Sequence, residues 1–183
     1  MHWKKILNKL EHNKEWDTAI VYMESILLEN PEDLDVYLSI NYLLMNLLVE
    51  EDYDRSSHEY YAKLLEKNFL ESFSKFSNNL EYLFFTGMTA FMSEWYFNIE
   101  IEDAEKMLQT AMQLEPSNVL YKWGYYGLLK VEEKKEDKKK AIPYAKLILD
   151  INSPIKKALE TKGSLGEYIL EIMTNWSDAV LMI

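Results

Sequence analysis

One residue spacing occurs twice in this chain and constrains its fold more than any other feature. It comprises an alanine, apolar residues four and seven positions later, and a proline five positions after that: Ala19, Met23, Ile26 and Pro31, then Ala104, Leu108, Ala111 and Pro116. Positions i, i+4 and i+7 share one face of a helix, whereas a proline is tolerated at a helix start but not in its interior. Each copy therefore predicts a helix, a tight turn and the start of another helix.

Composition supports an all-α fold. Of the 183 residues 48% are apolar, and only five are glycine and four are proline, so residues that break helices are scarce. A chain of this length can form one domain with a sizeable core. The absence of cysteine excludes a disulfide framework, a thiolate metal site and a cysteine nucleophile. No uninterrupted apolar run approaches the roughly 20 residues of a membrane span, so we expect a cytoplasmic protein.

The residues upstream of the first copy extend the pattern. Trp3, Ile6, Leu7 and Leu10 lie where the tetratricopeptide repeat (TPR) family has its Trp, Leu, Gly and Tyr, and the chain resembles that family over about residues 3 to 154. The family consensus has 34 residues in two antiparallel helices. Here the spacing of the second helix begins at Ala19, Ser57, Ala104 and Ala141, which are 38, 47 and 37 residues apart, so the copies are degenerate.

The resemblance implies a single domain, residues 1–183, folded as a TPR-like α-solenoid of about four antiparallel helix pairs. The pairs are expected at about 2–31, 32–69, 78–116 and 117–154. Capping signals agree: Asn30 would cap a helix with Pro31 at its first position, and Asn78 with Glu81 three residues later resembles a capping box.

A C-terminal segment, residues 155–183, follows the pairs. Its apolar residues recur at helical spacing: Leu165, Ile169, Ile172, Trp176 and Val180. Because a solenoid must cover its last apolar face, we expect a C-terminal capping helix. The alternative is an amphipathic tail that docks on a membrane, but such tails have a basic polar face and no Lys or Arg follows Lys162.

Charge is distributed unevenly along the chain. Residues 15 to 62 contain twelve acidic residues and one basic residue, Arg55, whereas the other residues contain 19 of each, so this quarter of the chain carries the whole net charge of −11. An acidic surface can simply aid solubility. Its confinement to one region favours instead a binding surface for a basic protein, and it disfavours nucleic acid and anionic membranes.

Candidate partner-binding residues come from two sources. The TPR resemblance implies that ligands lie on the concave surface formed by the first helix of each pair, which by register would include Asp35, Tyr42, Asn46, Glu81, Phe84 and Met88. The charge distribution adds the cluster Glu50, Glu51, Asp52 and Asp54. Aromatic and Met side chains at helical spacing are equally consistent with a core position. Trp95, Tyr96 and Phe97, in an insertion within the third pair, either contact a partner or fold over the core.

The sequence gives little support for catalysis. His2, His12 and His58 are far apart, and the glycines form no phosphate-binding pattern. We therefore expect no cofactor and no enzymatic activity. The favoured hypothesis is a protein-interaction module that binds a basic partner through its acidic surface, most concretely an immunity protein that neutralises a cationic toxin. An assembly scaffold or chaperone with an apolar concave groove is the alternative, and an unrecognised hydrolase or metal-dependent enzyme is a third.

Overall fold

The computed structural model describes the backbone of residues 2–128 and 135–181 and the side chains of residues 2–128 and 139–175. These residues form helices and turns and no strands, in agreement with the all-α expectation. The helices are α1 (His2–His12), α2 (Trp16–Glu29), α3 (Leu34–Val49), the short 3-10 helix η1 (Arg55–Ser57), α4 (His58–Phe76), α5 (Leu80–Ala90), α6 (Glu94–Phe97), α7 (Ile101–Leu114), α8 (Val119–Leu128), α9 (Lys135–Leu149), α10 (Pro154–Glu160) and α11 (Ser164–Leu181).

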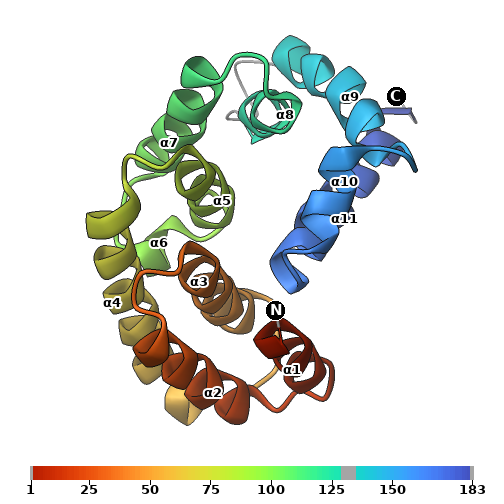
Figure 1. The fold of residues 1–183 in the computed structure, drawn as a ribbon. Helices are drawn as coiled ribbons and strands as arrows, with labels where there is room; N and C mark the ends of the chain where they lie inside the picture. The colour runs from red at the N-terminus through yellow and green to blue at the C-terminus, as the bar shows by residue number, and fades with distance from the viewer. Residues whose placement is uncertain (1, 129–134, 182–183) are drawn as a thin grey trace.

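The helices follow one another around an oval path (Figure 1). Along the chain α1 packs on α2, α3 on α4, α5 on α7 and α8 on α9, and the one-turn helix α6 lies between α5 and α7 in sequence. The helices α2, α4 and α7 lie on the outside of the oval, and α3, α5 and α8 lie towards its middle. The helices α10 and α11 lie between α9 and α1, so the C-terminal part of the described chain is beside its N-terminal helix.

The small residues of the repeated spacing are buried, and Ala104 of α7 lies close to α5, where a Cβ on Gly87 would be 3.1 Å from the Ala104 carbonyl oxygen. Ala19, Ala104 and Ala111 are fully buried, and Ala141 and Ala145 of α9 are nearly so. An alanine at a crossing lets two helix backbones approach each other closely, which ridge-into-groove packing requires. The apolar face expected for the C-terminal segment is buried at Leu165 and Ile169, while the side chains of Trp176 and Val180 lie outside the described residues.

Two predicted helix starts were wrong by one to three residues. The N-cap of α3 is Asp33, whose carboxylate accepts hydrogen bonds from the backbone N–H groups of Asp35 and Val36, and Pro31 lies in the preceding turn. The N-cap of α5 is Asn79, which accepts from the N–H of Tyr82. In both cases an Asp or Asn nearer the helix satisfies the free N–H groups of the first turn.

The C-terminal segment also differs from a single capping helix. It contains two helices, α10 and α11, and α11 packs against both α3 and α9. The segment therefore packs against the inner helix α3 as well as against α9.

Candidate functional site

The turn between α10 and α11 brings the C-terminal segment against α1. Gly163 has a φ of +66°, a left-handed conformation that favours glycine, and a Cβ at this position would lie 3.0 Å from Asn8 Oδ1. A Cβ on Gly166 would lie 1.9 Å from the carbonyl oxygen of Leu159, so only glycine allows α10 and α11 to approach this closely. The sequence Gly163-Ser164-Leu165-Gly166 is thus a structural turn that positions the segment.

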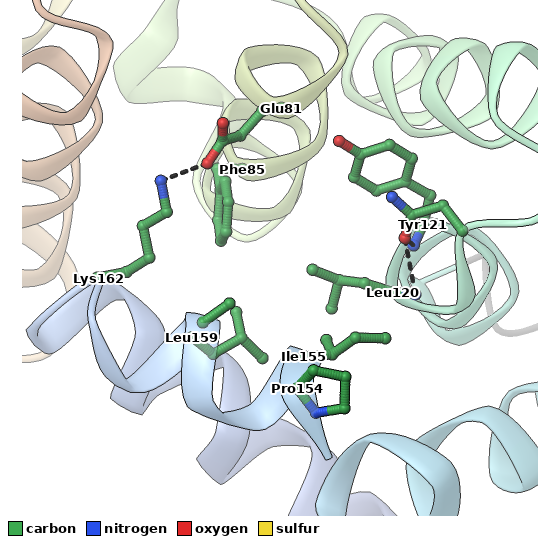
Figure 2. Close-up of a pocket in the computed structure, with 10 residues that line it drawn as sticks. Glu81, Phe85, Leu120, Tyr121, Pro154, Ile155, Leu159 and Lys162 are labelled. Atoms are coloured by element: carbon green, nitrogen blue, oxygen red, sulfur yellow. Dashed lines mark hydrogen bonds and ion pairs between the residues drawn. The ribbon is translucent and has the colours of Figure 1, made fainter.

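A cluster of four charges attaches this segment to the inner helices. The Lys162 ammonium contacts Asp35 Oδ1 at 2.6 Å and the Glu81 carboxylate, as the dashed line in Figure 2 shows for Glu81. Lys4 contacts the other oxygen of Asp35 at 2.7 Å and the carbonyl oxygen of Thr161 at 3.0 Å. Two of the acidic residues predicted to bind a basic partner therefore hold lysines of the same chain.

The protonation states of this cluster follow from its contacts. Burial raises the pKa of Asp35, but the hydrogen bonds from Lys162 and Lys4 outweigh burial and leave the pKa below its ordinary value. Burial lowers the pKa of Lys162, and the hydrogen bonds to Asp35 and Glu81 outweigh it, so the pKa is raised. Both groups are held in their charged forms at neutral pH.

The apolar candidates of the concave surface are covered in this conformation. Tyr42 is buried with its ring centroid 5.3 Å from that of Tyr168 on α11. Burial raises its pKa above the ordinary value, and the charge of Glu11 raises it further. Phe84 and Met88 are fully buried, and Asn46 is half-buried. The C-terminal segment thus covers part of the surface that the TPR resemblance assigns to a ligand.

A cavity of about 300 Å³ remains between α5, α8 and α10. Figure 2 shows Phe85, Leu120, Ile155 and Leu159 around it, with Glu81 and Lys162 at one end. Its complete lining is Glu81, Phe85, Asn118, Leu120, Tyr121, Pro154, Ile155, Ala158, Leu159 and Lys162. Of the ten predicted partner-binding residues, only Glu81 lines this cavity.

The second group of candidates, the acidic residues between positions 50 and 54, lies at the C-terminal end of α3, opposite the end that carries Asp35. Glu50 is the C-cap of α3, and about 22 Å of helix separates it from Asp35. Glu50 and Asp52 are exposed and have no ion-pair partner among the described residues. Glu51 is paired with Lys14 at 3.0 Å, and Asp54 caps η1 by accepting from the N–H of Ser56. We name Glu50, Glu51, Asp52 and Asp54 the acidic loop.

Aromatic side chains surround the acidic loop. Tyr53 lies within the loop and its ring stacks on His58, whose ring meets Tyr96 of α6 edge to face. Trp95 packs beside Tyr96, and 60% of its surface remains exposed. Within the insertion of the third pair, Phe97 is buried in the core, as one of the two interpretations expects, whereas the Trp95 side chain is largely exposed.

The α10–α11 attachment was missed by sequence reasoning. Lys4 and Lys162 were not among the candidates, although a segment that includes Lys156, Lys157 and Lys162 follows in a chain where two inner helices, α3 and α5, have an acidic residue in their first turn. That charge complementarity between the C-terminal segment and the acids of α3 and α5 was the available signal.

Comparison of the chain with protein-family models, with curated proteins and with solved structures gave no match. Within the described residues, no helix is long and apolar enough to cross a membrane. The same residues contain no group of three or more His, Cys, Asp or Glu side chains that could hold a metal ion.

Proposed function

We propose that this protein is a non-catalytic interaction module that binds a basic partner protein through the acidic loop and the exposed Trp95. In this proposal its fold is a TPR-like α-solenoid of four antiparallel pairs, α1 with α2, α3 with α4, α5 with α7 and α8 with α9. The pairwise packing along the chain and the buried alanines support this arrangement. Binding to a toxin, as an immunity protein in the cytoplasm, is its most concrete form.

The observation that carries the proposal is the exposed, unpaired acid at the end of α3. A carboxylate at a helix C-terminus is unfavourable by about 0.3 to 1 kcal/mol, because the helix dipole is negative there. Glu50 occupies this position and Asp52 follows it, with no basic residue in the last turn of α3. These charges do not stabilise the helix, so a role in binding explains them better than a role in folding.

The neighbouring aromatic residues suit the same kind of partner. Exposed tryptophan is enriched among residues that dominate binding energy, and its ring face attracts Lys and Arg side chains. In this protein the guanidinium group of Arg55 lies over the Tyr53 ring at 4.7 Å, an intramolecular example of this kind of contact. Acidic and aromatic side chains together would engage a cationic surface by charge and by contact.

The test replaces acidic side chains of the acidic loop by neutral amides and compares this variant with a matched control. Capture from the source cell should return a basic partner, whose binding is then measured for Glu50→Gln/Asp52→Asn and for Glu29→Gln/Glu160→Gln, two exposed acids elsewhere. Electrostatic steering gives association rates of about 10⁸ M⁻¹s⁻¹ at low salt, against about 10⁵ to 10⁶ without it. We expect the first variant to associate at least several-fold more slowly and the control to match the unmodified protein.

Equal association rates for both variants, or recovery of neutral or acidic partners only, would reject the acidic loop as the interface. For the immunity form, production of the protein should restore growth of cells that make the partner, and the Glu50→Gln/Asp52→Asn variant should protect less. The scaffold or chaperone alternative predicts salt-insensitive binding that this variant leaves intact. It also requires α11 to move, since Tyr168 of α11 packs on Tyr42.

A further inference from the structure

The cavity between α5, α8 and α10 has the composition of a small-molecule site. The buried side chains of Phe85, Leu120 and Leu159 form its apolar walls. Its volume of about 300 Å³ lies at the lower end of the range for ligand pockets. It is separate from the acidic loop, which lies at the other end of the inner helices. A ligand here is therefore independent of the proposed partner interface.

Two polar atoms in this cavity have capacity for hydrogen bonds. The Tyr121 side chain is 7% exposed, and its hydroxyl points towards Glu81 in Figure 2 without a hydrogen-bond partner among the described residues. Glu81 contacts Lys162 through Oε1, which leaves Oε2 available. A phenol hydroxyl and a carboxylate oxygen are therefore positioned to act together on one ligand group.

The local charge favours a cation over an anion. Lys162 and Lys4 are balanced by Asp35 and Glu81, so the lysines leave no excess positive charge at the cavity. Burial raises the pKa of Tyr121 to about 12, and the negative charges of Glu115 and Glu81 add to this effect. The same negative charges would stabilise an ammonium group beside the Tyr121 hydroxyl.

We propose that this cavity binds an apolar group that ends in a primary ammonium. The ammonium would donate hydrogen bonds to Glu81 Oε2 and to the Tyr121 hydroxyl oxygen, and the apolar body would pack on Phe85, Leu120 and Leu159. A free amine and a lysine side chain of another protein share this chemistry. Charge-assisted hydrogen bonds within an apolar pocket give both orientation and specificity.

Binding is measured by calorimetry and by protein NMR with three probes of similar shape. Phenethylamine carries the ammonium, phenethyl alcohol is neutral and hydrocinnamate is anionic. We expect phenethylamine to bind with a dissociation constant of about 1 mM or tighter, the alcohol about tenfold more weakly, and the anion more weakly still. A lysine with capped termini tests whether the ammonium comes from the side chain of another protein. If it binds as tightly as phenethylamine, a lysine side chain is the favoured source of the ammonium.

Variants locate the binding in the cavity. Tyr121→Phe keeps the ring and removes the hydroxyl, so it should weaken phenethylamine binding about threefold to tenfold. It should have little effect on the apolar contacts that phenethyl alcohol makes in the cavity. Ala158→Phe places a ring in the cavity from an exposed wall position and should abolish binding of all three probes. Glu160→Gln, on α10 but outside the lining, is the matched control and should change nothing.

Three results would overturn the proposal: no binding of phenethylamine at millimolar concentration, equal affinity for all three probes, or binding that persists unchanged in Tyr121→Phe and Ala158→Phe. Circular dichroism of each variant checks that it is folded, and Tyr121→Phe remains informative if Ala158→Phe is not. The Glu50→Gln/Asp52→Asn variant should bind phenethylamine normally, which separates this site from the partner interface.

Discussion

Replacement of Glu11 by glutamine tests how the C-terminal segment is held against α1. The Glu11 carboxylate accepts a hydrogen bond from the Ser164 hydroxyl at the start of α11. Burial raises the pKa of Glu11 from 4.5 to about 7, the Ser164 bond opposes this rise, and the charge of Glu167 adds to it. The group is therefore protonated in the folded protein over a pH range in which the unfolded chain has released the proton.

The sign of the effect on stability follows from this difference. A folded pKa above the unfolded value means that the stability associated with Glu11 is fully present below pH 4.5 and is lost as pH rises towards about 7. The full change corresponds to about 3 kcal/mol. Most of this change, about 2 kcal/mol, falls between pH about 5 and about 8. Glutamine cannot ionise, so Glu11→Gln removes this pH dependence.

The measurement is urea denaturation followed by circular dichroism at several pH values between these limits. The free energy of unfolding of Glu11→Gln minus that of the unmodified protein should increase by about 2 kcal/mol from pH about 5 to about 8. Effects of the substitution that do not depend on pH cancel in this comparison. Glu160→Gln, at an exposed carboxylate, should give a flat difference. A flat difference for Glu11→Gln as well would refute a buried, protonated Glu11.

Three further substitutions test other contacts by the same denaturation measurement. Gly166→Ala should cost about 1 to 3 kcal/mol or more, because its Cβ would meet the Leu159 carbonyl oxygen at 1.9 Å; an unchanged stability would show that α10 and α11 do not approach so closely. Glu50→Gln should stabilise the protein by about 0.3 to 1 kcal/mol by removing a negative charge from the C-terminus of α3, and destabilisation would contradict the helix-dipole argument. Lys162→Met should cost about 1 to 2 kcal/mol, less than the roughly 3 to 5 of a fully buried pair, because Glu81 is 41% exposed and Asp35 keeps Lys4; no loss would mean that the cluster does not hold α10 and α11.

The local features of the fold could be predicted from the sequence because they depend on neighbouring residues. The periodicity around Ala19 and Ala104 identified helices, which the structure confirms, and both alanines are buried. Helix starts were less accurate because several Asn and Asp residues compete to cap one helix: Asp33 and Asn79, rather than Asn30 and Asn78, accept the free N–H groups.

The position of the C-terminal segment could not be predicted because it depends on contacts between residues distant in sequence. The contact of Lys162 with Asp35 joins residues 127 positions apart, and no local pattern specifies such a pair. The same limitation affects the candidate site. Register alone placed Tyr42 and Phe84 on a ligand surface, whereas Tyr168 of α11 packs on Tyr42 and Tyr121 of α8 packs on Phe84. Exposure of Glu50 and Asp52 followed more directly, since charged residues between two helices are rarely buried.

The contacts of α1 with the α10–α11 turn have a consequence for how the molecule unfolds. A linear row of helical hairpins can lose its terminal units one at a time, because each unit touches only its neighbours. Here Lys4 donates to the Thr161 carbonyl oxygen, and Ser164 donates to Glu11, so opening at α1 also breaks contacts with α10 and α11. Fraying at one end is thereby coupled to the other, and the oval should melt in a single cooperative transition.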